Sequence, residues 1–333
     1  MREHKKSHLG MIGWGMFLAG ALSLGSCSGD ETLETMEKKA IAFGSVSIEN
    51  GSRAADPSYS TVSLNSFNVW GTVTGNTENI VLIFDGDEVE RPSTLTEGTY
   101  NPSTAWDCDE TQYWIPAATY NFMAIANANS VTPDDNGMPK AIGFEMSDGS
   151  KDLILAEPVA VRTNDYAEPI SGVNTSKYVP FTFTHLLSKV HFTFEDSNGN
   201  PVTNTEISNI QVTGHYGSGT YTIGAATPWG NQVPAPTTSP LSFGGIDAND
   251  TEATTSQYAR LIIPGTQTWS IKFAQNGETI DEPLILEGET AGTGYTFAPN
   301  TQYNILVTVG SNITFTINSL EAWGAEQNIP LNP

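Results

Sequence analysis

The sequence predicts an all-β protein made of antiparallel β-sandwiches. Short apolar runs and apolar–polar alternations recur from residue 41 onwards, and no stretch has the periodicity of a helix. Turns rich in Gly, Pro and Asn separate these runs, in a chain of 333 residues with 31 Gly and 19 Pro. Cys27 and Cys108 are the only cysteines, so packing between sheets rather than a disulfide framework is expected to hold the fold together.

Residues 1–26 have the pattern of a signal peptide. Arg2, Lys5 and Lys6 are followed by sixteen uncharged residues, Leu9 to Leu24, which is too short for a membrane-spanning helix. The sequence Leu24-Gly25-Ser26-Cys27 resembles the lipobox of bacterial lipoproteins. The resemblance implies cleavage before Cys27, a diacylglycerol on its sulfur and an acyl group on its new amine. The alternative is an ordinary signal peptide with a chance cysteine behind it.

The segment 27–40 is predicted to be a flexible tether, because it is polar and has no periodicity. Its acidic pair Asp30-Glu31 resembles the surface-export signal of Bacteroidetes lipoproteins. Without residues 1–26 the chain has 11 basic and 36 acidic residues, a net charge of −25. Such a charge repels nucleic acid and excludes it as a partner. The remaining 307 residues suggest about two domains.

The next segment, 41–53, contains a predicted first strand and an exposed loop. Ile41 and Phe43 are expected on one face of the strand, with Val46 and Ile48 on the other. The loop that follows is rich in small and turn-forming residues, and Arg53 lies within it. Arg53 is therefore an accessible protease site, or alternatively an ordinary solvated arginine.

Residues 54–172 are predicted to form an N-terminal β-sandwich. Strands are expected around five apolar runs of this region, namely Phe67–Gly71, Ile80–Phe84, Tyr120–Ala126, Asp152–Ala156 and Val159–Val161. The pattern is lost over 163–180, and the domain boundary is placed there.

Residues 173–333 are predicted to form a second sandwich. Phe181 and Phe183 alternate at odd positions, whereas Val190, Phe192 and Phe194 alternate at even positions, so a bulge or bend is expected at Leu186-Leu187. Tyr303–Val309, the turn Gly310-Ser311-Asn312 and Ile313–Ile317 give the clearest hairpin signal in the chain.

No catalytic residue, metal site or cofactor is predicted. Asp85–Glu88 and Asp134–Gly137 lack the spacing of an EF-hand and are interpreted as turns. His185 and His191 fall on opposite sides of the parity change, which disfavours a shared metal. The acidic neighbours of Cys108 disfavour a thiolate nucleophile. Several tryptophans could stack on sugars if they were exposed.

Taken together, these motifs resemble the fimbrillin-like family of Bacteroidetes, the subunits of type V pili. The residues that carry the resemblance are Cys27, Ile41–Ile48, Arg53-Ala54, Phe67–Gly71, Tyr113–Pro116, Tyr120–Phe122, Asp152–Ala156, Phe183–Val190, Tyr303–Val309 and Trp323. The resemblance implies two tandem transthyretin-like sandwiches. It also implies a lipoprotein precursor at the outer membrane, held by lipid on Cys27. On this resemblance, an arginine-directed protease would cut between Arg53 and Ala54 and release the first strand. A strand from another pilus subunit would then fill the groove that this opens.

The C-terminal end, 313–333, has two interpretations. Ile313, Phe315, Ile317, Leu320 and Trp323 either complete the second sandwich of their own chain or form a donor strand for a neighbour. The resemblance favours donation.

The function predicted from these features is a structural subunit of a surface pilus that serves adhesion. The alternative is a monomeric surface lipoprotein that binds a glycan or a host ligand. An enzyme is not expected.

Overall fold

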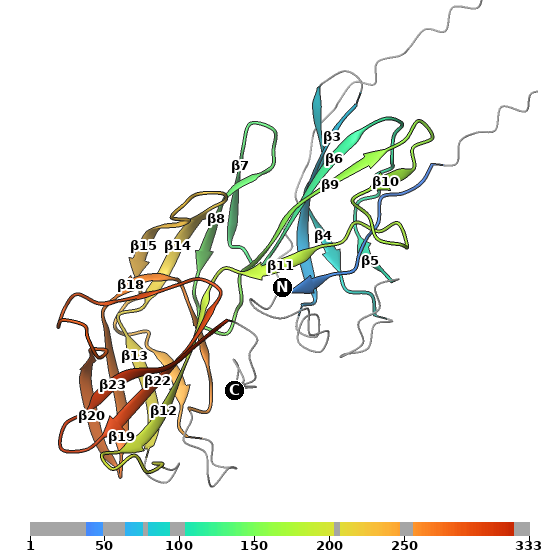
Figure 1. Ribbon diagram of the computed structural model, residues 1–333. Coiled ribbons are helices and arrows are strands. Elements are labelled where there is room, and N and C mark those ends of the chain that lie inside the picture. The colour runs from blue at the N-terminus through green and yellow to red at the C-terminus, as the bar shows by residue number, and fades with distance from the viewer. Residues whose placement is uncertain are drawn as a thin grey trace, which may run out of the picture. The chain divides into compact units, whose positions relative to one another are not determined.

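The structure, a computed structural model, describes residues 38–48, 64–75, 79–93, 104–202, 207–246 and 256–322. Every regular element in these ranges is a β-strand, which confirms the all-β prediction (Figure 1). The strands form a nine-stranded sheet, three four-stranded sheets and a two-stranded sheet. The division into two tandem domains stays a prediction.

The nine-stranded sheet is built from the first half of the chain. Its strands run in the order β1 (Phe43–Gly44), β5 (Ala105–Cys108), β4 (Ile80–Glu90), β3 (Ser66–Thr74), β6 (Thr119–Ala126), β9 (Ile154–Thr163), β11 (Thr182–His185) and β2 (Ser47–Ile48), with β10 (Pro169–Ser171) paired to β9. The sheet starts and ends with strands that are separated in sequence only by Ser45 and Val46. One short segment therefore joins its two edges.

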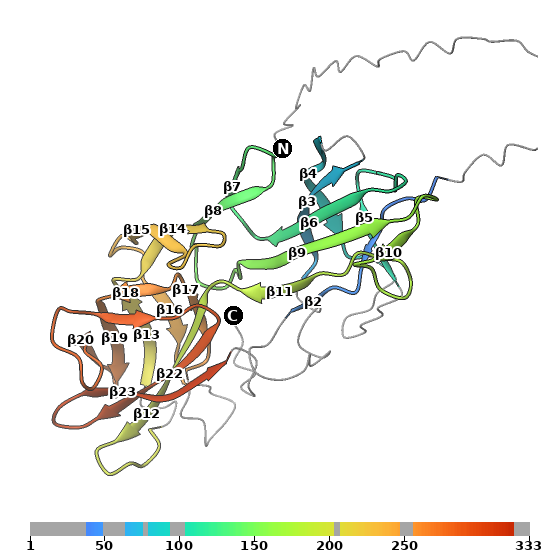
Figure 2. The ribbon, with the colours of Figure 1, turned by 45° about the horizontal axis from the view of Figure 1, so that its top comes forward.

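The second half contributes two four-stranded sheets (Figure 2). One has the order β17 (Arg260–Ile262), β12 (Ser188–Asp196), β22 (Thr301–Val309) and β23 (Thr314–Ala322). The other has the order β16 (Leu241–Gly244), β13 (Ile207–Thr213), β19 (Trp269–Gln275) and β20 (Glu278–Leu284). One buried cluster holds side chains from both sheets, including Phe192 and Ile305 from the first and Ile271 and Phe273 from the second. The expected hairpin is confirmed, because β22 and β23 pair antiparallel across residues 310–313.

A fourth sheet joins strands from both halves. It has the order β15 (Trp229–Pro234), β14 (Tyr216–Thr222), β8 (Pro139–Glu145) and β7 (Ser130–Pro133), and β8 pairs with β14 from Ala141 to Glu145. The remaining pair is β18 (Gly265–Gln267) with β21 (Tyr295–Phe297). A buried cluster that includes Trp70, Ile142, Leu187 and Leu261 lies against this sheet, and the Trp229 indole donates to the Leu186 carbonyl at 2.9 Å. Packing and hydrogen bonds thus connect the halves.

The predicted bend at Leu186-Leu187 is confirmed as a change of sheet. β11 ends at His185 in the nine-stranded sheet, and β12 begins at Ser188 in the next one. Even-numbered side chains of β12 face the second core, formed by the two sheets of the second half, and both leucines are buried in the cluster that lies against the fourth sheet. The first sheet therefore continues to His185, beyond residue 172.

Candidate assembly site

The segment that joins the two edges of the first sheet, residues 38–48, is hydrogen-bonded on both sides. On one side Ile41 N donates to Gln112 O at 2.8 Å, and β1 pairs antiparallel with β5. On the other side Gly44 N donates to Val179 O at 3.0 Å, and β2 pairs parallel with β11. Two strand edges thus depend on this segment for their hydrogen-bonding partners.

Four apolar side chains anchor the segment in the first core. Phe43 is fully buried, and Ile41, Val46 and Ile48 are at most 7% exposed. The Phe43 ring packs against Phe84, Phe122 and Phe181, with centroids 5.3, 5.8 and 5.6 Å away. Full burial of such side chains stabilises by about 1.5–3 kcal/mol each, so the segment is a substantial part of this core.

The expectation that Ile41 and Phe43 lie on the opposite face from Val46 and Ile48 was wrong, because all four belong to the same core. The backbone at Ser45 is left-handed, with a φ of 56°, and this breaks the alternation of the strand. Asn174 Nδ2 donates to Ser45 Oγ at 2.7 Å beside the break. A side chain at Gly44 would come within 2.7 Å of the Tyr178 ring, so the close approach of backbone to ring requires glycine there.

The predicted donor strand lies in β23, at the edge of its own sheet. It pairs with β22 from Thr314 to Ala322 and has a bulge at Asn318, because Ser319 faces Asn304 whereas Ile317 faces Ile305. On its other edge Glu287 N donates to Phe315 O at 2.9 Å. An open groove of about 430 Å³ lies along Thr316–Leu320, with Leu286 and Tyr295 on its other wall. The outer edge of β23 is therefore accessible over most of its length.

Burial along β23 is shallow. Phe315 is 4% exposed and packs in the second core, with Ile313 and Ile317 partly buried against it. Leu320 is 59% exposed. The described part of the predicted donor strand thus has one deeply buried anchor, whereas the segment 41–48 has four.

The remaining predicted site residues, Cys27, Arg53, Ala54 and Trp323, lie outside the residues that the structure describes. The sequence interpretation missed the strand edge at Val179, Phe181 and Phe183, which are all fully buried. Their alternation was visible in the sequence. Their parallel pairing with a segment more than 130 residues earlier was not.

Buried polar groups cluster on β12 and its neighbours. Lys189 and His191 are 2% and 1% exposed, and burial lowers the pKa of the Lys189 amine. Burial, aided by the charge of Lys189, lowers the pKa of His191 to about 4. His185 Nδ1 lies 2.6 Å from Asp152 Oδ2. A buried and neutral His191 is a structural residue rather than a titrating catalyst at neutral pH.

The other candidate chemistry has structural explanations. Burial first, and then the charges of Asp87, Asp109 and Glu110, raise the pKa of the Cys108 thiol. Asp134 Oδ1 accepts from Asn136 N and Met138 N at 2.8 and 2.9 Å, as in an ordinary Asx turn. Among the described residues, no group of three or more His, Cys, Asp or Glu side chains could hold a metal ion. No helix within them is long and apolar enough to span a membrane.

Comparison with known proteins identifies the family. The sequence model of the fimbrillin-like family matches residues 38–323, which include all of the described strands. The chain belongs to the fimbrillin-like family. None of the curated proteins matches this sequence.

Solved structures support the fold of this fimbrillin-like chain. It is similar to a proposed cell adhesion protein from Bacteroides ovatus, with 14% identity, a TM-score of 0.57 and coverage of 87% of this chain and 100% of the other. A second proposed cell adhesion protein, from Bacteroides uniformis, gives 15% identity, a TM-score of 0.51 and coverage of 87% and 99%. At these identities the likeness establishes the fold.

Proposed function

We propose that this fimbrillin-like protein is a structural subunit of an adhesive cell-surface pilus of type V. On this proposal the chain is exported to the outer membrane as a lipoprotein on Cys27 and cut after Arg53. It then assembles with other subunits by strand exchange. Membership of the fimbrillin-like family supports the pilus role, and the organisation of the first sheet supports the exchange.

The observation that carries the proposal is the closure of the first sheet by residues 41–48. A cut after Arg53 separates this segment covalently from β3 and the rest of the fold. Its departure would leave β5 paired only with β4 and β11 paired only with β9, so that each has an unpaired edge beside a slot lined by Phe84, Phe122 and Phe181. Unpaired edges beside an apolar slot are a template for an added strand.

The apolar spacing of β23 matches the spacing of that segment. In the first segment the buried residues are Ile41, Phe43, Val46 and Ile48, spaced by two, three and two positions. In the C-terminal strand the apolar residues Phe315, Ile317, Leu320 and Ala322 have the same spacing. Both segments have a break between their second and third apolar positions, at Ser45 in one and at the Asn318 bulge in the other. A strand with this pattern from a second subunit could therefore bury its apolar face in the slot.

Burial favours such an exchange. Leu320 is 59% exposed in its own chain, and the corresponding position in the first segment, Val46, is 1% exposed. Transfer of apolar surface from water to the slot stabilises at roughly 25 cal/mol per Å². The loss of Phe315 from the second core opposes this gain.

A chain that ends at Asn312 tests the proposal. Donation predicts that the truncated protein still folds but forms no filaments, as judged by thermal melting and by electron microscopy of the trimmed protein. Collapse of the second half would instead show that β23 is required in its own core. The control is trimmed protein with its complete C-terminus. It should form filaments and give an oligomer ladder on a denaturing gel without heating.

The alternative, a monomeric surface lipoprotein that binds a glycan or host ligand, is favoured by the groove beside β23. Its wall has the aromatic ring of Tyr295 and the polar side chains of Thr316, Asn318 and Ser319. A single lipid-anchored band on the unheated gel, together with the absence of filaments, would support this function instead.

A further inference from the structure

Six large apolar side chains are exposed around one end of the first sheet. They are Ile80 (49% exposed), Val81 (53%), Tyr113 (44%), Ile115 (43%), Tyr166 (70%) and Ile170 (62%). Among the described residues, only two other large apolar side chains are exposed to this degree, Val233 at 57% and Leu320 at 59%. We call these six side chains the end patch.

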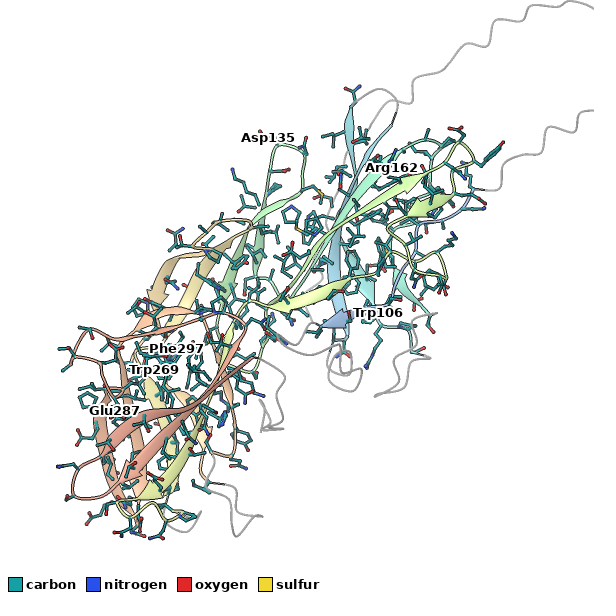
Figure 3. All side chains as sticks on the ribbon, in the orientation of Figure 1. Trp106, Asp135, Arg162, Trp269, Glu287 and Phe297 are labelled. Atoms are coloured by element: carbon teal, nitrogen blue, oxygen red, sulfur yellow. The ribbon has the colours of Figure 1, made fainter. Side chains whose placement is uncertain are left out.

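Strand pairing places the end patch on neighbouring elements. Across the sheet, the start of β4 at Ile80 pairs with the end of β3 at Thr74, which pairs with the start of β6 at Thr119. Thr119 in turn pairs with Arg162 near the end of β9. The short strand β10, which contains Ile170, also pairs with this end of β9. The Ile115 carbonyl accepts from Thr163 Oγ1 at 2.7 Å. Tyr166 lies in the turn between β9 and β10, where its backbone N donates to Asn164 Oδ1 at 2.9 Å. Figure 3 labels Arg162 near the end of β9, just before this turn. The patch therefore lies where these strands begin or end.

The described chain also begins at this end. Ala40 bridges to Tyr113, Lys38 Nζ lies 5.7 Å from the Tyr113 ring centroid, and Lys39 is paired with Glu168. The blue start of the ribbon reaches the same end of the sheet as β10 (Figures 1 and 2). Cys27 precedes Lys38 by eleven residues, which span at most about 36–40 Å when fully extended. A lipid on Cys27 would thus hold the end patch close to the bilayer.

We propose that the end patch contacts the lipid surface of the outer membrane while the uncut precursor is anchored through Cys27. This inference rests on the lipidation of Cys27 in the proposed function. Isoleucine and tyrosine side chains on turns and strand ends suit the interfacial region, where a tyrosine ring is apolar on its faces and polar at its hydroxyl. The cut after Arg53 would release the protein from this contact.

A lipid surface fits these residues better than a protein partner does. The patch is spread over the start of β4, the segment before β6, the turn between β9 and β10, and β10, rather than along one strand edge. A weak apolar contact becomes significant only when a tether keeps the local concentration high, and the eleven-residue link supplies such a tether. The pairing of Lys39 with Glu168 also neutralises one of the acidic groups beside the patch.

The test holds the mature chain on vesicles by an artificial anchor, so that the result does not depend on acylation in the cell. A hexahistidine tag replaces Cys27 and binds nickel-chelating lipid in vesicles of phosphatidylethanolamine and phosphatidylcholine. Cys108→Ser removes the native thiol, and Tyr166→Cys then supplies a single thiol to which an environment-sensitive fluorophore is attached. Val233→Cys, which is 57% exposed in β15 and outside the patch, is the matched control.

Membrane contact predicts that vesicles raise the fluorescence at position 166 roughly two-fold and shift it to the blue, and leave position 233 unchanged. Adding Ile115→Ser and Ile170→Ser should remove the rise at position 166. Equal responses at positions 166 and 233 would overturn the proposal. A second result would also overturn the proposal: no vesicle signal at position 166, together with loss of filament assembly in the two-serine variant. That result would assign the patch to contact with another subunit. Fatty-acid labelling of Cys27 is measured separately, so failure of lipidation is distinguishable from failure of the membrane contact.

Discussion

The ring of Phe43 stacks on the ring of Phe181, with centroids 5.6 Å apart and planes at 24°. Both rings are fully buried. Phe43 belongs to the segment that the proposed cut would release, and Phe181 belongs to the edge that would remain. Exchange therefore requires an incoming side chain to cover Phe181, and the shared apolar spacing assigns that place to Ile317.

Phe43→Ala should destabilise the uncut precursor by about 3–5 kcal/mol, because it leaves a cavity among the rings of Phe84, Phe122 and Phe181. Chemical denaturation measures this loss of free energy of unfolding. Val233→Ala, at an exposed position, should change it by no more than about 0.5 kcal/mol. In protein trimmed to begin at Ala54 the segment is absent, so a chain made with Phe43→Ala and then trimmed should match the wild type. A persistent difference after trimming would show that the segment is retained.

Cys27→Ala should abolish lipid labelling, because no other residue in the lipobox has a thiol. The variant should remain soluble in the periplasm or keep its signal peptide. Incorporation of labelled fatty acid, followed by separation of membrane and soluble fractions, measures both effects. Undiminished labelling of the variant would contradict the lipoprotein proposal.

Arg53→Ala should leave a folded precursor that does not assemble. The change is expected to cost less than about 0.5 kcal/mol if the loop is exposed, as its composition predicts. Arg53→Lys is the matched variant, because it keeps the charge but removes the side chain that an arginine-directed protease requires. N-terminal sequencing of the wild-type surface form should begin at Ala54. Filaments made of chains that still begin at Cys27 would refute the processing step.

Much of the fold could be predicted from apolar periodicity. The alternation in Tyr303–Val309 and Ile313–Ile317 predicted the β22–β23 hairpin, and the parity change at Leu186-Leu187 predicted the bend that the structure places between two sheets. Periodicity failed at Ser45, where a left-handed residue places both pairs of apolar side chains in one core. A single φ angle is not encoded by a pattern of side chains.

Long-range pairing was the other part that sequence reasoning could not provide. The pairing of β8 with β14 joins segments about 75 residues apart, and neither segment has a sequence pattern that identifies the strand with which it pairs. The burial of Lys189 and His191 was not predicted either, because alternation along β12 says only that they lie on the opposite face from Val190 and Phe192. For the candidate site, the sequence indicated the two segments that the proposal exchanges, and the structure added the strand edges at β5 and β11.

Acid should destabilise the protein between about pH 6.5 and pH 4. Burial lowers the pKa of His191 and of His215 to about 4, whereas both histidines titrate near 6.5 in an unfolded chain. Above pH 6.5 both states are neutral and the histidines contribute nothing to the pH dependence. As the pH falls below 6.5 the unfolded state binds protons that the folded state does not, so the free energy of unfolding decreases, by up to about 3 kcal/mol for each residue.

His191→Asn should reduce the acid-induced loss while costing some stability at pH 7. Urea denaturation of the wild type and the variant at pH 7 and pH 5 measures the difference. Val233→Ala, which changes no titrating group, should retain the full pH dependence. The same pH dependence in the wild type and in His191→Asn would show that His191 titrates normally in the folded state.

A labelled peptide of residues 313–322 should bind the trimmed subunit and not the uncut precursor. In the precursor, Ile41, Phe43, Val46 and Ile48 occupy the slot, so the peptide has no place to pair. In the trimmed protein the peptide can pair with the vacated edges and bury Phe315, Ile317 and Leu320 with the spacing that the first segment had. A matched peptide that lacks Asn318 changes the spacing from two, three and two to two, two and two. With Phe315 and Ile317 in place, its leucine then falls one residue short of the position that Val46 occupies. This peptide should bind at least about ten-fold more weakly, since loss of one buried leucine corresponds to about 1.5–3 kcal/mol.

Fluorescence anisotropy of both peptides with trimmed and uncut protein gives the four affinities. Equal binding of the peptide to trimmed and uncut protein would show that it does not bind in the slot vacated by residues 41–48. Equal binding of the two peptides would rule out the proposed register.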